Sequence, residues 1–143
     1  MPIRIRRIRL SDYEDLVALL EMSGMEPRTR GRESRTAIAS QLRISRNRYL
    51  GAFDGGRLVG VVLGTHDGRK GWINRLAVHP EYRRRAIGAR LVRDCERVLR
   101  KRGLEMFAAL IEPDNVGSAA FFRSLGYDIL PILYARKKRR ESV

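Results

Sequence analysis

The chain has 143 residues, of which 43% are hydrophobic and 32% charged, a composition typical of one soluble globular domain with a single core. Its 30 lysines and arginines exceed its 16 acidic residues, and the resulting net charge of +14 favours an anionic ligand or partner. No apolar run is long enough to cross a membrane, the N-terminal stretch lacks the apolar core of a secretory signal, and a single cysteine permits no internal disulfide. We therefore expect a cytoplasmic protein with one domain over residues 1–143 and a basic tail at about 137–143.

The first half of the chain predicts a strand, two helices and a β-hairpin. Alternating isoleucine and arginine indicate a strand over residues 3–8, and a helix is expected from about 11 to 24. A more polar helix follows at about 32–44, after a loop that contains a proline. Two apolar runs at 49–53 and 58–65 flank an Asp-Gly-Gly turn, which is typical of a hairpin.

The second half predicts strands that alternate with helices. A strand over residues 72–78 leads into a helix over 86–102, and the continuous apolar run at 106–111 predicts a strand buried on both faces. A helix at 115–125 and one or two strands within 127–136 complete the chain. The order β-α-α-β-β-β-α-β-α-β predicts an α/β (α+β) fold, with a mixed, mostly antiparallel sheet of six or seven strands and helices on both faces.

The junction between the strand at 72–78 and the next helix predicts a phosphate site. The strand ends in Leu76-Ala77-Val78-His79-Pro80, and the helix begins after Arg83-Arg84-Arg85-Ala86-Ile87-Gly88. The first amides of a helix have no intrahelical partner, the helix dipole is positive there, and arginine forks suit phosphate oxygens. A run of arginines alone would favour a solvated basic helix start, so the spacing of the motif decides the interpretation.

This segment resembles the cofactor motif of the GNAT superfamily of acyl-CoA-dependent N-acyltransferases, Arg/Gln-x-x-Gly-x-Gly/Ala after a strand that ends in Val-x-Pro. Ala86 stands at the first glycine of the motif, and we expect it to adopt a helical φ and to preserve binding. A second segment, Asn115-x-x-x-Ala119-x-Phe121-Phe122-x-x-x-Gly126-Tyr127, resembles the second motif of the superfamily. Together the two motifs span about residues 72–127.

The resemblance implies an N-acetyltransferase that moves the acetyl group of acetyl-CoA to a primary amine by direct attack in a ternary complex. Acetyl-CoA would lie between the strands at 72–78 and 106–111, with an amide near Leu76 or Ala77 polarising the thioester carbonyl. The residues that the resemblance places at the cofactor are Leu76, Ala77, Val78, Arg83, Arg84, Arg85, Ala86, Ile87, Gly88, Ala89, Asn115, Ser118 and Phe122.

The catalytic groups differ from the usual ones of the superfamily. The tyrosine that protonates the departing thiolate is replaced by Phe122, and the glutamate base of the ribosomal-protein acetyltransferases is replaced by Leu110. Our candidates are Asn74, which would orient the substrate or a water, and Glu112, which would act as the base through a water. Tyr134 would act as the acid. Each also has an ordinary structural explanation, as a strand, turn or edge residue. No cluster of cysteine and histidine predicts a metal site.

Two classes of function remain open from the sequence. The first is the acetyltransferase, whose amine acceptor is a small molecule or a protein N-terminus. Because the loop at 25–31 is basic, an acidic amine suits it better than a polyamine or an aminoglycoside. The alternative is a non-catalytic basic module that binds nucleic acid or an acidic partner. The basic runs contain few aromatic residues on which bases would stack, so nucleic acid is not an expected partner. A homodimer stays open, and a membrane partner is not expected.

Overall fold

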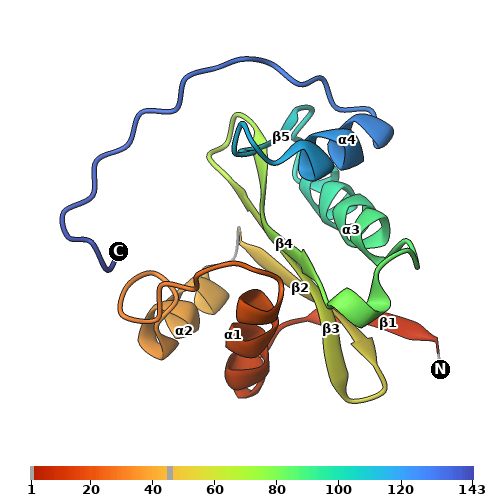
Figure 1. Ribbon diagram of the computed structural model, residues 1–143, viewed down its shortest axis with the longest axis vertical. Helices are drawn as coiled ribbons and strands as arrows, with labels where there is room; N and C mark the ends of the chain where they lie inside the picture. The colour runs from red at the N-terminus through yellow and green to blue at the C-terminus, as the bar shows by residue number, and fades with distance from the viewer. Residues whose placement is uncertain (1, 45–46) are drawn as a thin grey trace.

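The computed structural model describes residues 2–44 and 47–143, which form a five-stranded sheet with helices on both faces (Figure 1). The elements in chain order are β1 (Ile3–Arg7), α1 (Tyr13–Met22), α2 (Arg35–Arg43), β2 (Arg48–Asp54), β3 (Arg57–His66), β4 (Gly71–Val78), α3 (Ile87–Lys101), β5 (Phe107–Ala109) and α4 (Val116–Ser124). Short 3-10 turns, Leu10–Asp12 and Pro80–Tyr82, precede α1 and α3. The predicted fold class and the order of elements up to α4 are confirmed.

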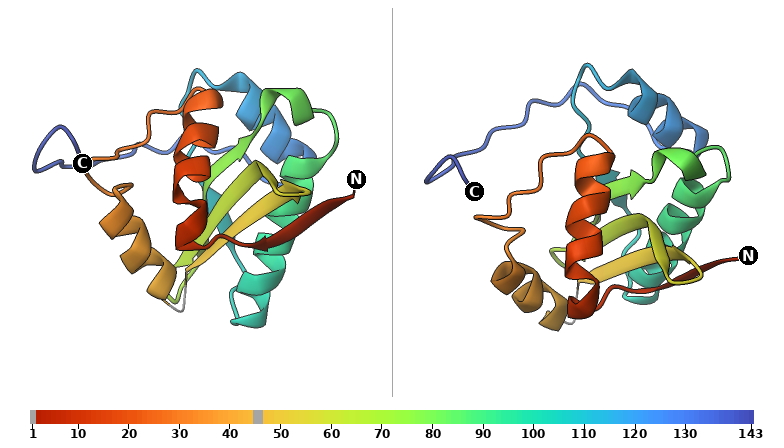
Figure 2. Two further views of the ribbon diagram at one scale, coloured as in Figure 1. Left: turned by 90° about the horizontal axis from the view of Figure 1, so that it is seen from below. Right: turned by 60° about the horizontal axis from the view of Figure 1, so that its bottom comes forward.

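The strands lie in the sheet in the order in which they occur in the chain. Each of β1 to β4 is antiparallel to its neighbour, and β4 and β5 are parallel, as the crossover through α3 predicted. Helices α1 and α2 cover one face of the sheet, and α3 and α4 cover the other (Figures 1 and 2).

The sheet separates two apolar cores, so the central strands are buried on both faces. In β3, Val59 packs towards α3 and Val61 towards α1, and neither is exposed to solvent. Full burial of such a side chain contributes about 1.5–3 kcal/mol. Helix α3 lies close on β3 because Gly64 has no side chain, and a Cβ there would collide with Cys95 Sγ. Near the other end of β3, a Cβ on Gly60 would lie 3.0 Å from Ile87, and Gly60 pairs with Val78, so the start of α3 packs beside the end of β4.

The strands expected within residues 127–136 are not formed. Residues 128–143 make an extended C-terminal arm that leaves α4 and ends beside the loop that precedes α2 (Figure 1). Pro131 lacks an amide hydrogen and divides the apolar run, and Ile132 donates to Leu130 in a local turn at 3.0 Å. The described part of the sheet therefore has five strands, rather than six or seven.

Strand β5 is shorter and more exposed than its sequence predicted. Only Phe107–Ala109 pair with β4, and the flanking Met106 and Leu110 are more than half exposed, at 55% and 58%. The expected burial on both faces is wrong, because Phe107, Ala108 and Ala109 are each only partly buried at the last strand of the described sheet.

Candidate functional site

Strands β4 and β5 diverge after a short parallel ladder. Gly71, Trp72 and Ile73 pair with Phe107, Ala108 and Ala109, and β5 ends at that point. Because β4 continues to Val78, its edge on the β5 side has no neighbouring strand over residues 74–78 in the described chain. An extended ligand can pair with such an edge as an additional strand would. We call this opening the splay.

A β-bulge lies in β4 at the splay. Asn74 pairs with Leu63 and Ala77 with Val61, so Arg75 and Leu76 both lie opposite Val62. Arg75 has a φ of 52°, in the left-handed region that non-glycine residues avoid at a cost of about 1–3 kcal/mol. Such a conformation persists only where surrounding contacts impose it.

A buried ion pair holds Arg75 in this conformation. Glu33, only 4% exposed, lies in the loop between α1 and α2 and accepts a hydrogen bond from Arg75 Nη2 at 2.7 Å, and its second carboxylate oxygen lies 2.6 Å from Arg75 Nε in an ion pair. Its carboxylate also accepts the amide of Arg28 at 2.8 Å, and the Tyr13 hydroxyl donates to its carbonyl at 2.7 Å. The pair therefore fastens the loop and α1 to the bulge. No local pattern predicts this pair, because the two residues lie 42 positions apart.

Tyr49 lies in the apolar core between the sheet and α1, and its hydroxyl is unpaired within the described residues. Its side chain is buried, and its oxygen has no hydrogen-bond partner within the described residues. Burial raises the pKa of Tyr49, and the nearby Glu33 carboxylate raises it further, so the phenol stays protonated. A buried hydroxyl without a partner costs about 1–3 kcal/mol unless a water or a ligand reaches it.

The basic turn before α3 has a different backbone from the predicted one. Arg84 and Ala86 have φ values of 66° and 58°. Ala86 is therefore left-handed rather than helical, and it occupies the N-cap position just before α3. The left-handed residues turn the chain from the 3-10 turn that ends at Tyr82 into α3. Arg90 donates to the Ala86 carbonyl at 3.0 Å, which leaves the amides of residues 87–89 without intrahelical partners. These amides and the exposed side chains of Arg83, Arg84 and Arg85 form an anion-binding arrangement.

The second motif forms the helix that packs beside this turn. Asn115 caps α4, and its Oδ1 accepts the amide of Ser118 at 3.0 Å. A Cβ at Gly88 would lie 3.4 Å from Phe121, so α3 and α4 approach closely here. Phe122 is 5% exposed and packs edge-on against Phe121 and Tyr127. Its ring therefore lies in the core, although the resemblance places Phe122 at the cofactor.

The three predicted catalytic side chains are not brought together. Asn74 is half-buried on β4 and donates to the Thr65 hydroxyl at 3.2 Å. Glu112 is exposed in the turn after β5, and Tyr134 is 66% exposed on the C-terminal arm. No hydrogen bond in the described chain joins any two of them.

Two other expectations concern metals and membranes. Within residues 2–44 and 47–143, no group of three or more histidine, cysteine or acidic side chains is arranged to hold a metal ion. The helices in the same residues are too short or too polar to cross a membrane.

The sequence matches the model of the acetyltransferase (GNAT) family over residues 7–127. It is 28% identical over 128 residues to acetyltransferase SG1711 of Sodalis glossinidius, covering 89% of this chain and 88% of that protein. It is 29% identical over 127 residues to acetyltransferase plu1384 of Photorhabdus laumondii, covering 88% and 87%. Among solved structures, the PaiA N-acetyltransferase of Thermoplasma acidophilum in complex with coenzyme A superposes with a TM-score of 0.84 at 22% identity, over 92% of this chain and 93% of that one. The chain therefore belongs to the GNAT acetyltransferase family, which confirms the family and the enzyme class that its two motifs predicted.

Proposed function

We propose that this GNAT acetyltransferase takes its acetyl group from acetyl-CoA and transfers it to a primary amine by direct attack in a ternary complex. The observation that carries the proposal is the splay, an open edge of β4 that leads into a basic turn at the start of α3. An open strand edge suits the amides of pantetheine, and the turn suits a diphosphate. The coenzyme A bound to the Thermoplasma acidophilum neighbour supports the same ligand class.

The proposed cofactor contacts follow the splay and the turn. The backbone of Leu76, Ala77 and Val78 would pair with pantetheine, and the amides of Ile87, Gly88 and Ala89 would bind the diphosphate. Arg83, Arg84 and Arg85 add charge that strengthens the attraction at low ionic strength. Ser118 and Asn115, at the start of α4, border the same turn through the close packing of α4 on Gly88. Phe122 contributes packing from the core rather than a direct contact.

The chemistry needs an oxyanion donor, a route for the amine proton and a leaving thiolate. The bulge turns backbone groups near Leu76 out of the ladder with β3, and we propose one of these amides as the donor to the thioester oxygen. A coenzyme A thiol has a pKa near that of cysteine, about 8.5, so its thiolate leaves without a dedicated acid. Asn74 is our candidate for orienting the amine or a water, and Glu112 for receiving the proton through water. Nothing in the contacts of Tyr134 supports its role as the acid.

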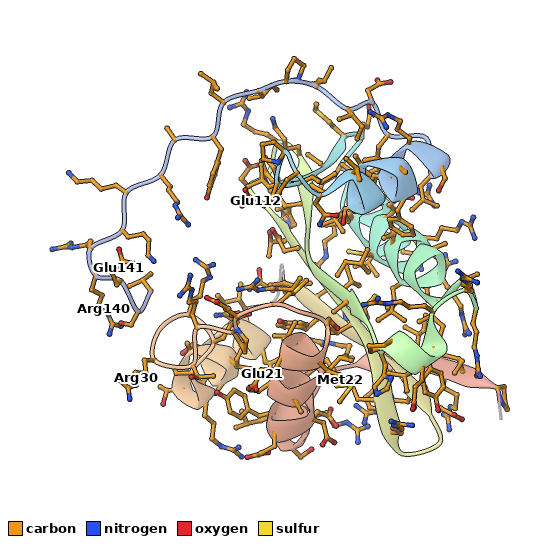
Figure 3. The ribbon with its side chains drawn as sticks, in the orientation of Figure 1. Glu21, Met22, Arg30, Glu112, Arg140 and Glu141 are labelled. Atoms are coloured by element: carbon orange, nitrogen blue, oxygen red, sulfur yellow. The ribbon has the colours of Figure 1, made fainter. Side chains whose placement is uncertain are left out.

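The acceptor we propose is an amine that carries negative charge, such as the N-terminus of an acidic peptide. The loop before α2 is tied to the bulge through Glu33 and contributes the cations Arg28, Arg30 and Arg32. The end of the arm packs on Gly31 and brings Arg140 to the same place (Figure 3). Because the Glu33 carboxylate is engaged with Arg75 and the exposed Glu26 carboxylate lies 4.0 Å from Arg28, the carboxylates of the loop are offset by its own cations and offer little attraction to a polyamine. We propose a cytoplasmic location, which suits the free, buried Cys95.

An acetylation panel tests the proposal. Release of coenzyme A thiol would be followed with acetyl-CoA and four acceptors: an acidic peptide, a neutral peptide, a polyamine and an aminoglycoside. We expect the highest kcat/KM with the acidic peptide. Gly88→Glu should abolish coenzyme A binding in calorimetry, whereas the matched Gly88→Ala should retain it, because a methyl group fits at 3.4 Å from Phe121.

The outcomes separate the classes of function. A protein that binds coenzyme A but prefers the polyamine or the aminoglycoside would overturn the acceptor and leave the transfer reaction intact. If coenzyme A does not bind and no amine is acetylated, the enzyme itself is excluded. Binding of acidic peptides or nucleic acid without turnover would then support the basic-module alternative.

A further inference from the structure

The peptide bond between Arg75 and Leu76 lies in the bulge of β4, between two side chains that leave the strand on opposite faces. The Arg75 guanidinium reaches the loop between α1 and α2, where Glu33 binds it. The Leu76 side chain packs against the core under α3. In a regular ladder, hydrogen bonds to the neighbouring strand would orient this peptide group, but both residues lie opposite Val62 and the ladder is interrupted here. The orientation of the peptide group therefore depends on how the two side chains are anchored.

The anchor of Arg75 is a rigid part of the loop. The Glu33 carboxylate holds the guanidinium at two nitrogens, Nη2 at 2.7 Å and Nε at 2.6 Å. The same carboxylate accepts the Arg28 amide at 2.8 Å, and the Glu33 amide donates back to the Arg28 carbonyl at 2.9 Å. Contact at two points fixes the direction of a planar guanidinium as well as its position. The ion pair therefore transmits the position of residues 28–33 to the backbone of β4.

The backbone of Arg75 needs this anchor. Its φ of 52° lies in the left-handed region, which a residue with a Cβ leaves when nothing holds it there. A rotation about this φ turns the whole peptide group that follows, including the amide of Leu76. Loss of the ion pair would therefore turn away an amide that lies at the open edge of β4, where the thioester is proposed to bind.

We propose that Glu33 and Arg75 are positioning residues for acetyl transfer, because their ion pair aims the Leu76 amide at the thioester oxygen. The inference rests on the proposed function and selects this amide as the oxyanion donor. Neither side chain has to touch the substrate. The loop that carries Glu33 also carries the arginines proposed to attract the acceptor, so the ion pair joins the acceptor side of the site to the donor.

The first test detects the hydrogen bond to the thioester without any acceptor. Acetyl-CoA labelled with carbon-13 at its carbonyl is bound to the full chain, and its carbonyl resonance is compared with that of the free compound. A donor at the carbonyl oxygen polarises the bond and moves the resonance downfield. We expect this shift in the wild type and its loss in Glu33→Gln. The affinity for acetyl-CoA should change by no more than about twofold, because the turn that binds the diphosphate is unaltered.

A double variant separates positioning from stability. Glu33→Gln alone leaves a buried guanidinium without its carboxylate, which destabilises the fold. Adding Arg75→Met removes that charge and places an apolar side chain of similar length beside Met25, so part of the lost urea midpoint should return. Because the contact between loop and bulge is still missing, the carbonyl resonance should remain near the free value. A double variant that regains both the midpoint and the wild-type resonance would show that the pair is structural only.

The ion pair of Arg6 and Asp12 is the matched control. Its guanidinium also binds a carboxylate at two nitrogens, at 2.9 and 3.2 Å, and this carboxylate likewise accepts a backbone amide, that of Arg9. It involves β1, at the opposite edge of the sheet from the splay. Asp12→Asn should therefore lower the urea midpoint and leave the resonance of bound acetyl-CoA at its wild-type value. Loss of the shift in this variant too would attribute the effect to stability and refute the positioning role.

Turnover provides a second readout. With the best acceptor of the acetylation panel, Glu33→Gln and the double variant should lose about a hundredfold in kcat, as expected when one oxyanion donor is lost. The KM for acetyl-CoA should stay close to that of the wild type. An unchanged kcat in both variants would contradict the proposal.

The point of failure shows which inference is wrong. A wild-type chain that does not bind acetyl-CoA overturns the enzyme and the positioning role together. A wild-type chain that binds acetyl-CoA without a downfield shift excludes an oxyanion donor at the bulge. A downfield shift that persists in Glu33→Gln and in the double variant leaves the proposed function intact and overturns only the role of the ion pair.

Discussion

Replacing Ala86 with glycine tests the left-handed turn that starts α3. Ala86 has a φ of 58°, and an L-residue costs about 1–2 kcal/mol in that region relative to the right-handed one. Glycine avoids this cost but loses about 0.5–1 kcal/mol more backbone entropy on folding. The net expectation is a rise in the free energy of unfolding of about 0.5–1 kcal/mol. The turn is retained, so the affinity for coenzyme A should be equal to that of the wild type or higher.

Urea unfolding of Ala86→Gly is best compared with that of Ala89→Gly. Ala89 lies in the first turn of α3, where alanine is favoured, so glycine should lower stability by about 0.5–1 kcal/mol. The two substitutions remove the same methyl group three residues apart and should shift the midpoint in opposite directions. If both lower it equally, Ala86 is helical in solution and the account of the turn is wrong.

Four further expectations follow from buried groups. Glu33→Gln should lower the free energy of unfolding by about 3 kcal/mol because it leaves the Arg75 guanidinium without its carboxylate, and an unchanged urea midpoint would contradict this. Tyr49→Phe should be neutral or stabilising by up to about 1 kcal/mol, whereas a clear loss would reveal a partner for its hydroxyl. Phe122→Tyr should destabilise by about 1–3 kcal/mol without raising turnover, and faster turnover at unchanged stability would instead place the ring at the cofactor. Burial raises the pKa of Cys95 from 9.0 to about 12, so the unfolded thiol ionises first and stability should fall as pH rises from 9 towards 12. Cys95→Ala should flatten that part of the pH profile.

The elements up to α4 could be predicted because their signals are local. The periodicity of α3, the turn between β2 and β3 and the helix cap at Asn115 each depend on residues within a few positions of one another. The end of β4 and the start of α3 were located by the same kind of spacing. A prediction from pattern succeeds where neighbours in the chain are also neighbours in space.

The failures all involve contacts between distant segments or backbone choices that the residue type disfavours. Glu33 and Arg75 meet through the fold, and nothing near either residue indicates the other. Ala86 occupies a conformation that its side chain opposes, so composition alone pointed to the wrong φ. The apolar run around Leu133 has the composition of a strand, but a strand also needs a neighbour, and the described chain supplies none.

The bulge in β4 determines how the protein would respond to a change in chain length. Ile73 packs under α3 and Ala77 under α1, although an unbroken strand would place residues four apart on the same face. Deleting Arg75 would restore a regular strand and leave every other side chain of β4 on its present face. Deleting Leu76, the other residue of the bulge, would also restore the regular ladder, whereas a deletion in the middle of either flanking segment would invert part of the strand and expose apolar groups. The bulge is thus the place in this strand where the sheet ladder tolerates a shorter chain, whereas the buried Glu33 carboxylate needs Arg75 as its cation.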